Sequence, residues 1–260
     1  MVSKESFDEL IRKSYDFEEV KYVNNPQWEL LKELYEGNYV NDDGTRDYTN
    51  LPKKIHQIWL GSQLPKEYKI HTDTWAKYNP DWEYRLWTDK DVNDVDIPNR
   101  KLFDSIRNLG QKSDFLRYHI LNQFGGIYAD TDFECLKSFN SLSYVDFFVG
   151  IGFPRNVELY IGLFGSIPHH KFLEEIIKRM NTIKDGDWRE VFNTTGTYFF
   201  TKIFFEVIRK FEKGIVPLPT DYFYPFPNQW GHEHRNGKNY IKDCSYAVHH
   251  WAVSWSKKFK

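Results

Sequence analysis

Four Asp-x-Asp triplets are the side chains best suited to chemistry in this sequence: Asp89/Asp91, Asp94/Asp96, Asp130/Asp132 and Asp185/Asp187. Two carboxylates one residue apart repel each other, and a divalent cation relieves that repulsion. Because the motif occurs four times, only its context can identify a site. Asp130 and Asp132 alone directly follow a predicted buried strand, which ends at Ala129. We therefore predict a metal site at this pair, with a capping pair on a loop as the alternative.

A second pair of charged residues lies on the helix predicted just before that strand. Asp114 and Arg117 are three residues apart and share one helix face. With Ser113 as N-cap, Asp114 falls in the first turn, where the helix dipole favours an anion. A carboxylate and a guanidinium side by side can bind a polyhydroxylated ligand, whereas the alternative is a surface ion pair. Gly125 and Gly126 allow a tight turn that brings Asp130 near Asp114.

The elements that position these residues are strands alternating with helices. Apolar or alternating runs predict strands at 54–60, 82–87, 127–129 and 147–152, with short strands near Ile215 and Tyr246. Helical patterns lie at 66–78, 113–124, 168–183 and 197–212. This alternation predicts an α/β fold with a mostly parallel central sheet flanked by helices. Ligands bind such sheets at the carboxyl ends of the strands, where Asp130 and Asp132 are expected.

The first fifty residues have a different pattern. Apolar residues at helical spacing and the pair Asn25-Pro26, a capping residue followed by a first-turn proline, predict helices there. We therefore expect residues 1–50 to form a helical extension packed on a main domain of residues 51–260.

Composition narrows the class of protein. The 260 residues are 40% hydrophobic and 28% charged, with a net charge of −2 and dispersed basic residues, which argues against a nucleic-acid partner. No apolar run reaches the length of a membrane span and residues 1–14 lack the apolar core of a secretory signal, so we expect a cytoplasmic protein, with peripheral membrane contact left open. Two cysteines agree with a reducing compartment. Aromatic residues make up 18%, which suits stacking on sugars or bases.

Four segments in fixed order carry a resemblance to a known family: LPKKIHQIWLG at 51–61, NPDWEYRLWT at 79–88, KSDFLRYHILNQFGGIYADTD at 112–132 and HHWAVSW at 249–255. Together they resemble glycosyltransferase family 32, which includes the yeast initiating mannosyltransferase and capsule-synthesis enzymes. The core is also similar to the glucosyltransferase domain of clostridial toxins. The resemblance implies a GT-A fold, a nucleotide-sugar donor, Mn²⁺ or Mg²⁺, and retention of anomeric configuration. A UDP-sugar is the favoured donor and GDP-mannose the second, with a saccharide or glycoconjugate as acceptor.

The resemblance also implies roles for residues on the donor side. Trp59, with Ile58 beside it, matches the end of the first strand, where a tryptophan stacks on the nucleotide base. Asp114 and Arg117 match the pair that holds the donor sugar, and Tyr128 matches a donor-side tyrosine. Asp114 and Arg117, together with Asp130, are thus the expected catalytic residues.

Metal ligands are implied in the same way. Asp132 matches the direct ligand, and Asp130 matches a residue that spans ribose and metal. His250 matches a late ligand brought in by the last strand, although His249 is the alternative because one sequence does not fix the register. Trp255 matches a tryptophan that contacts the diphosphate.

Two segments depart from the family pattern. Tyr160 stands where many relatives carry asparagine, and Thr197 stands where they often carry proline after Thr-Gly. Both segments should line the sugar- and acceptor-binding side of the site, so these two departures leave the identity of the donor sugar open. A sugar nucleotidyltransferase is the first alternative function, but residues 60–65 (LGSQLP) lack the expected basic, glycine-rich phosphate loop. An inactive carbohydrate-binding relative is the second, and it would be expected to lose one of the two aspartates, which are both present.

Overall fold

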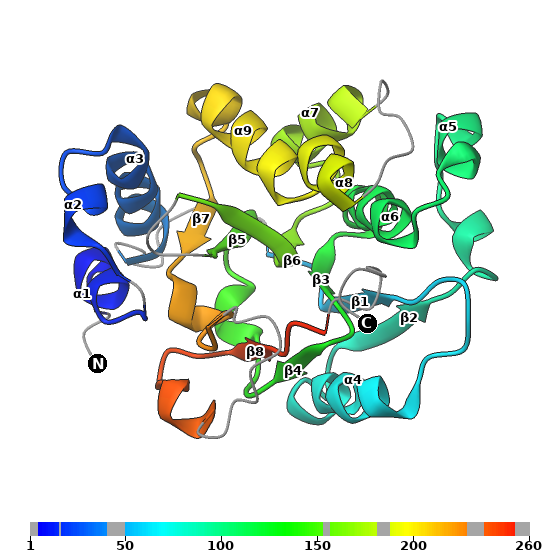
Figure 1. Ribbon diagram of the computed structural model, residues 1–260, viewed down its shortest axis with the longest axis horizontal. Helices are drawn as coiled ribbons and strands as arrows, with labels where there is room; N and C mark the ends of the chain where they lie inside the picture. Colours follow the sequence, from blue (N-terminus) through cyan, green and yellow to red (C-terminus); the bar gives the residue numbers. More distant parts are fainter. Residues whose placement is uncertain are drawn as a thin grey trace.

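The computed structural model in Figure 1 describes residues 5–15, 17–40, 50–152, 157–180, 188–227 and 237–252. A six-stranded sheet lies at its centre, with the strand order β2-β1-β3-β6-β5-β7. The strands are β1 (Lys54–Ile58), β2 (Glu83–Trp87), β3 (Gly126–Ala129), β5 (Phe147–Ile151), β6 (Leu159–Ser166) and β7 (Ile215–Leu218).

The pairing of these strands confirms the predicted mostly parallel sheet. Strand β1 pairs in parallel with both β2 and β3, and β5 pairs in parallel with β7. Strand β6, which the sequence pattern did not predict, runs antiparallel between β3 and β5. The strand predicted near Tyr246 is β8 (Ala247–His249), which pairs with β4 (Phe133–Cys135) in a separate antiparallel sheet. This small sheet holds the C-terminal segment against the residues that follow β3.

Helices cover both sides of the sheet (Figure 1). On one side lie α6 (Leu109–Phe124), α7 (Lys171–Met180), α8 (Trp188–Thr194) and α9 (Thr197–Val207), while α4 (Lys66–Tyr78) packs against β4 on the other side. A short helix α5 (Arg100–Ser105) precedes α6. Helix α6 presents buried Leu116 and Ile120 to the core. Among the described residues, no helix combines the length and apolarity that a bilayer crossing requires.

The start of helix α6 differs from the prediction. Asn108, not Ser113, is the N-cap, and its side-chain oxygen accepts hydrogen bonds from the backbone N–H groups of Gly110 and Gln111 at 2.9 and 3.2 Å. The prediction was wrong because a second capping residue lies one turn upstream. Asp114 therefore sits beyond the first turn, where the helix dipole contributes little.

The described part of the N-terminal region contains the α-helices α1 (Phe7–Arg12), α2 (Glu19–Tyr22) and α3 (Pro26–Tyr35), and a π-helical turn at Glu36–Val40 follows α3. As predicted, Asn25 caps α3 and Pro26 opens it. Helix α3 packs against β7, and the hydroxyls of Tyr35 and Tyr222 are 3.2 Å apart. Asn38 donates from Nδ2 to the carbonyl of Ile215 at 2.9 Å. These contacts attach the helices to the edge of the sheet, while the boundary between an extension and a main domain at residue 50 stays a prediction.

Two glycines make the turn from α6 into β3. Gly125 has φ 62° and Gly126 has φ 95°, a region that favours glycine. A Cβ atom on Gly126 would lie 2.4 Å from the carbonyl oxygen of Lys54 in the neighbouring strand. The predicted tight turn is therefore required by the close packing of β3 on β1, and it sets the position of the residues at the end of β3.

Candidate active site

Two aspartates mark the carboxyl end of β3, at the centre of the sheet. Asp130 follows Ala129, the last residue of β3, and its backbone N–H donates to the carbonyl of Gly162 in β6 at 2.7 Å. The hydroxyl of Tyr128 donates to Asp130 Oδ1 at 2.6 Å. The side chain of Asp130 keeps 30% of its surface exposed, whereas Asp132 is buried. One carboxylate of the pair is therefore open to a ligand.

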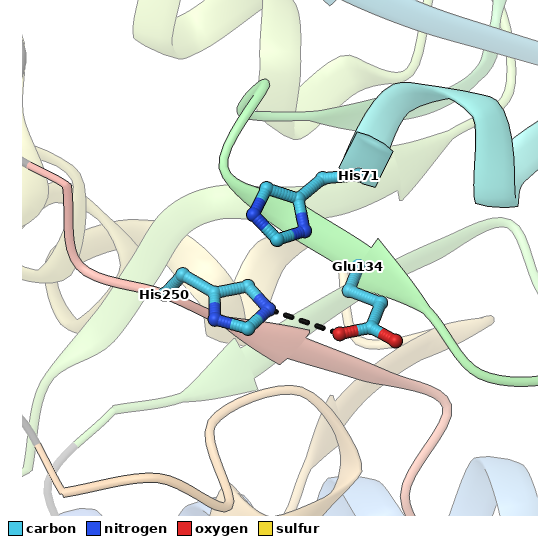
Figure 2. Close-up of side chains that lie close together, drawn as sticks. All are labelled: His71, Glu134 and His250. Carbon is cyan, nitrogen blue, oxygen red and sulfur yellow. Dashed lines mark hydrogen bonds and ion pairs between the residues drawn. The ribbon is translucent and has the colours of Figure 1, made fainter. Parts of the chain in front are cut away.

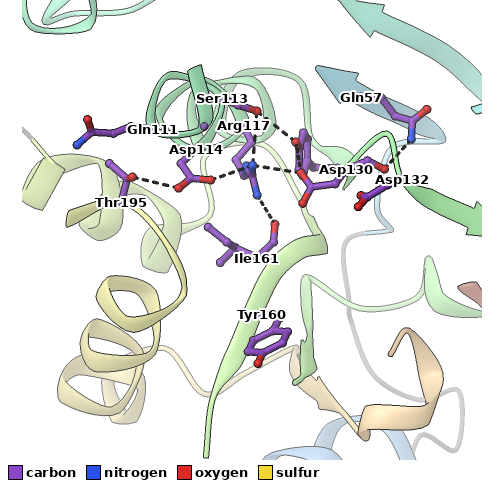
Figure 3. A network of polar contacts seen from close by, with 12 residues as sticks. Gln57, Gln111, Ser113, Asp114, Arg117, Asp130, Asp132, Tyr160, Ile161 and Thr195 are labelled. Carbon is purple, nitrogen blue, oxygen red and sulfur yellow. Dashed lines mark hydrogen bonds and ion pairs between the residues drawn. The ribbon is translucent and has the colours of Figure 1, made fainter. Parts of the chain in front are cut away.

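Arg117 connects this strand end to helix α6 (Figure 3). Its guanidinium lies 2.8 Å from Asp114 Oδ1 and 3.1 Å from Asp130 Oδ1, and it donates to the carbonyl of Ile161 at 2.9 Å. It also lies 4.4 Å from the ring centroid of Tyr128, a cation–π contact. The side chains of Arg117 and Asp114 are only 6% and 9% exposed. The alternative of a surface ion pair is therefore wrong.

Burial decides the electrostatics of these carboxylates. It raises the pKa of Asp114 to about 6, against the opposing effect of Arg117. Burial also raises the pKa of Asp130, opposed by Arg117 and assisted by repulsion from Asp132. Burial acts in the same direction on Asp132, but His249 beside it outweighs this effect and holds the pKa of Asp132 at about 2. Asp132 is thus the carboxylate held most firmly in its anionic form.

Asp130, Asp132 and His249 form a group that could hold a metal ion, since one ligand atom from each lies within 4.8 Å of the others. His249 Nε2 is 3.1 Å from Asp132 Oδ1, and the backbone N–H of Ala252 donates to Asp132 Oδ2 at 2.8 Å. Two carboxylate oxygens and one imidazole nitrogen suit Mn²⁺ or Mg²⁺ with coordination positions left for a ligand. The residues present therefore fit a divalent cation.

The structure brings His249 to the aspartate pair and places the predicted ligand His250 elsewhere. Successive residues of a strand point to opposite faces, and His249 is paired with Phe133 in the β4–β8 sheet. His250 instead lies 3.0 Å from Glu134 Oε2 and stacks on His71. The sequence left either histidine open as the metal ligand, and this geometry supports His249. Trp255, the predicted diphosphate contact, lies outside the described residues.

The end of β1 offers a partly exposed aromatic side chain. The backbone N–H of Trp59 donates to the carbonyl of Trp87 at 2.9 Å, which extends the β1–β2 pairing by one residue. Its indole N–H donates to Ser62 Oγ at 3.1 Å, and its ring lies 4.8 Å from that of Tyr68. Ile58, by contrast, is buried, as is the ring of Tyr128. Trp59 is therefore the residue of this set whose aromatic side chain is partly exposed.

Several polar contacts of the site were missed by sequence reasoning. Gln57 Nε2 donates to the carbonyl of Asp130 at 3.0 Å, and Thr195 Oγ1 donates to Asp114 Oδ2 at 3.1 Å (Figure 3). A Cβ on Gly162 would approach Asp130 Oδ2 to 3.0 Å, so this glycine preserves the space beside the carboxylate. Thr195 and Gly162 had a signal, since they belong to the two segments already expected to line the sugar and acceptor side. The Gln57 contact depends on strand pairing and has no local signature.

One family model matches part of the chain, and several known proteins are similar to it. Residues 65–148, which include Asp114, Arg117, Asp130 and Asp132, match the family model described as "Glycosyltransferase sugar-binding region containing DXD motif". The chain is 29% identical over 226 residues to an uncharacterised glycosyltransferase of Acanthamoeba polyphaga mimivirus, covering 81% of this chain and 86% of that protein.

Two yeast proteins are also similar. Inositol phosphoceramide mannosyltransferase 2 of Schizosaccharomyces pombe is 32% identical over 142 residues, which cover 53% of this chain and 41% of that protein. A mannosyl phosphorylinositol ceramide synthase of Saccharomyces cerevisiae is 28% identical over 185 residues, 66% of this chain and 48% of that protein. The match thus spans less than half the length of either yeast relative.

Among solved structures, the PaToxG glycosyltransferase superposes with a TM-score of 0.53 at 18% sequence identity, covering 63% of this chain and 71% of that chain. At this identity the likeness concerns the fold, which is that of GT-A glycosyltransferase domains.

Proposed function

We propose that this chain, a glycosyltransferase similar to those of family 32, transfers a hexose from a nucleotide-sugar to a hydroxyl of a saccharide or glycoconjugate, with retention of configuration. The observation that carries the proposal is the convergence of two sets of residues at the carboxyl end of β3, in the centre of the sheet. Asp130, Asp132 and His249 form a cation-binding group, and Arg117 joins Asp130 to Asp114 within hydrogen-bonding distance.

Each residue has a chemical task in this proposal. Asp130, Asp132 and His249 would hold Mn²⁺ or Mg²⁺, which supplies positive charge to the diphosphate leaving group when bound. Arg117 and Asp114 orient the sugar, since a guanidinium donates to hydroxyl oxygens and a carboxylate accepts from hydroxyl groups. Trp59 stacks on the base from the end of β1. Fixing the donor in this way removes much of the entropic part of the barrier.

The reaction that these residues favour proceeds on one face of the sugar. The bond from the anomeric carbon to the diphosphate oxygen breaks, and the acceptor hydroxyl oxygen bonds to that carbon from the side the diphosphate leaves. The hydroxyl proton passes to the departing diphosphate. Asp114 and Asp130 both pair with Arg117, which suits orienting roles, and the preference for a route without a covalent intermediate comes from the resemblance to family 32.

The donor is tested by incubating the protein with each UDP-sugar and with GDP-mannose in the presence of Mn²⁺, and measuring the nucleoside diphosphate released. We expect slow hydrolysis of one donor without acceptor. The yeast relatives are named a mannosyltransferase and a mannosyl phosphorylinositol ceramide synthase, which supports GDP-mannose beside the UDP-sugars. Pyrophosphate release from a sugar phosphate and a nucleoside triphosphate would instead identify a nucleotidyltransferase. Saccharide binding without turnover of any donor would identify an inactive relative.

Replacing Trp59 tests the base-binding role. Trp59→Ala should raise the donor KM by about 10- to 100-fold, because base–aromatic stacking contributes about 1–3 kcal/mol, and Trp59→Phe should raise it less. Donor KM is measured from nucleotide release, and stability from thermal unfolding. Tyr144→Ala is the matched control, since Tyr144 is 57% exposed and precedes the amino end of β5, whereas Trp59 follows the carboxyl end of β1. A loss of about 3–5 kcal/mol of stability in Trp59→Ala would show a core tryptophan instead.

A further inference from the structure

A second group of potential metal ligands lies beside the active site and takes no part in it. His71 comes from α4, Glu134 from β4, and His250 from the residue after β8. One ligand atom from each lies within 4.8 Å of the others (Figure 2). Their side chains converge from three elements far apart in the sequence, so the fold itself assembles this group.

The contacts within the group leave one buried nitrogen unsatisfied. His250 Nε2 lies 3.0 Å from Glu134 Oε2, and the rings of His71 and His250 stack with centroids 4.1 Å apart. His71 Nδ1 is buried and has no hydrogen-bond partner among the described residues. Leaving a buried polar atom unpaired is costly. Because the lone pair of an imidazole nitrogen lies in the plane of its ring, a cation held by the carboxylate and by Nδ1 of His71 would bind at the ring edges, and it would give this nitrogen a partner.

Two imidazoles and one carboxylate are the ligands of a transition metal. Zn²⁺ is held by His₂Glu sets that leave a fourth position open, whereas Mg²⁺ prefers oxygen ligands. Tetrahedral Zn²⁺ with bonds of about 2.0–2.2 Å places its ligand atoms about 3.3–3.6 Å apart. Every pair of these ligand atoms lies within 4.8 Å, so rotations of the side chains would bring them to tetrahedral spacing. From this geometry we propose that His71, Glu134 and His250 form a second divalent-metal site that binds Zn²⁺.

The position of the site gives it a structural effect. His250 follows His249, and the backbone N–H of His250 donates to the carbonyl of Asp132 at 3.0 Å. A cation held by His71 and His250 links helix α4 to the C-terminal segment at the residue beside the active-site histidine. It thus fixes that segment whether or not a donor is bound, and the inference stands independently of sugar transfer.

Zinc binding by the metal-free chain tests the proposal. It is measured in the Asp132→Asn variant, which disables the metal-binding group of Asp130, Asp132 and His249. The Asp132→Asn protein should still bind one equivalent of Zn²⁺ by titration calorimetry and give the visible spectrum of a nitrogen-bound ion with Co²⁺. Adding His71→Asn or Glu134→Gln should weaken zinc affinity by at least about 100-fold, because even residues that only support a ligand often cost 10- to 100-fold. Zn²⁺ should also raise the Tm of the Asp132→Asn protein, but not of these double variants.

His169→Asn in the same background is the matched control. His169 is an exposed histidine with φ 54°, a conformation that asparagine tolerates, and it should leave zinc affinity unchanged. Circular dichroism checks folding, and the half-exposed Glu134 provides the milder variant if His71→Asn unfolds. Equal zinc affinity with and without the cluster substitutions would overturn the proposal, as would complete loss of zinc binding in Asp132→Asn. Either result would mean that these residues form no zinc site and that His250 and Glu134 only share a hydrogen bond.

Discussion

Asp132→Asn is expected to lower sugar transfer by about 100-fold or more while the fold stays intact. Asparagine keeps the shape of the side chain but loses the charge that the cation requires. His249 holds the pKa of Asp132 at about 2 despite burial, which favours the anionic form that a cation requires. Removing a preorganised electrostatic contact commonly costs 10²- to 10³-fold in rate. Mn²⁺-dependent nucleotide release measures the loss, and circular dichroism checks the fold.

Asp96→Asn is the matched control for this substitution. Asp96 belongs to another Asp-x-Asp triplet, but it is exposed and lies outside both groups of metal ligands. Its replacement should leave turnover and the Mn²⁺ requirement unchanged. Full activity of Asp132→Asn would remove the metal assignment of the aspartate pair, whereas equal loss in both variants would show a general effect of charge.

The sequence sufficed where local signals determine the structure. The glycines at 125 and 126 predicted the turn into β3, and the apolar residues before Asp130 predicted that a buried strand delivers the aspartates. Both features depend on neighbours along the chain. The N-cap of α6 was mistaken because Asn108 and Ser113 are both good capping residues, and capping preference alone does not distinguish them.

Long-range pairing explains what could not be predicted. Which of His249 and His250 faces the aspartates depends on the register of β8 against β4, and a shift by one residue exchanges the two faces. Neither β4 nor β6 had a clear alternating pattern, so the antiparallel strand at the centre of the sheet was missed. The Gln57 contact to the backbone of Asp130 follows from the pairing of β1 with β3. All three depend on residues distant in sequence.

Arg117→Met is expected to cost about 3–5 kcal/mol of stability, because removing one partner of a buried ion pair leaves uncompensated charge. Methionine fills similar space but leaves Asp114, Asp130 and the carbonyl of Ile161 without their shared partner. Urea unfolding should show a lower midpoint with an unchanged slope. Burial raises the pKa of Asp114 to about 6, so below that pH the carboxyl group is protonated and has no charge for Arg117 to compensate. The stability lost in Arg117→Met should therefore be smaller below about pH 6 than above it.

Two further variants separate stability from catalysis at Arg117. Adding Asp114→Asn to Arg117→Met removes one of the two unpaired carboxylates, so the double variant should be more stable than Arg117→Met alone. Arg117→Lys keeps the positive charge but loses the planar fork that reaches both carboxylates and the Ile161 carbonyl. It should retain most of the stability and still lose donor turnover, because the sugar is no longer oriented.

A loss of less than about 1 kcal/mol in Arg117→Met, the value of an exposed ion pair, would contradict the buried network. Unchanged turnover in Arg117→Lys would show that Arg117 stabilises the fold without orienting the donor.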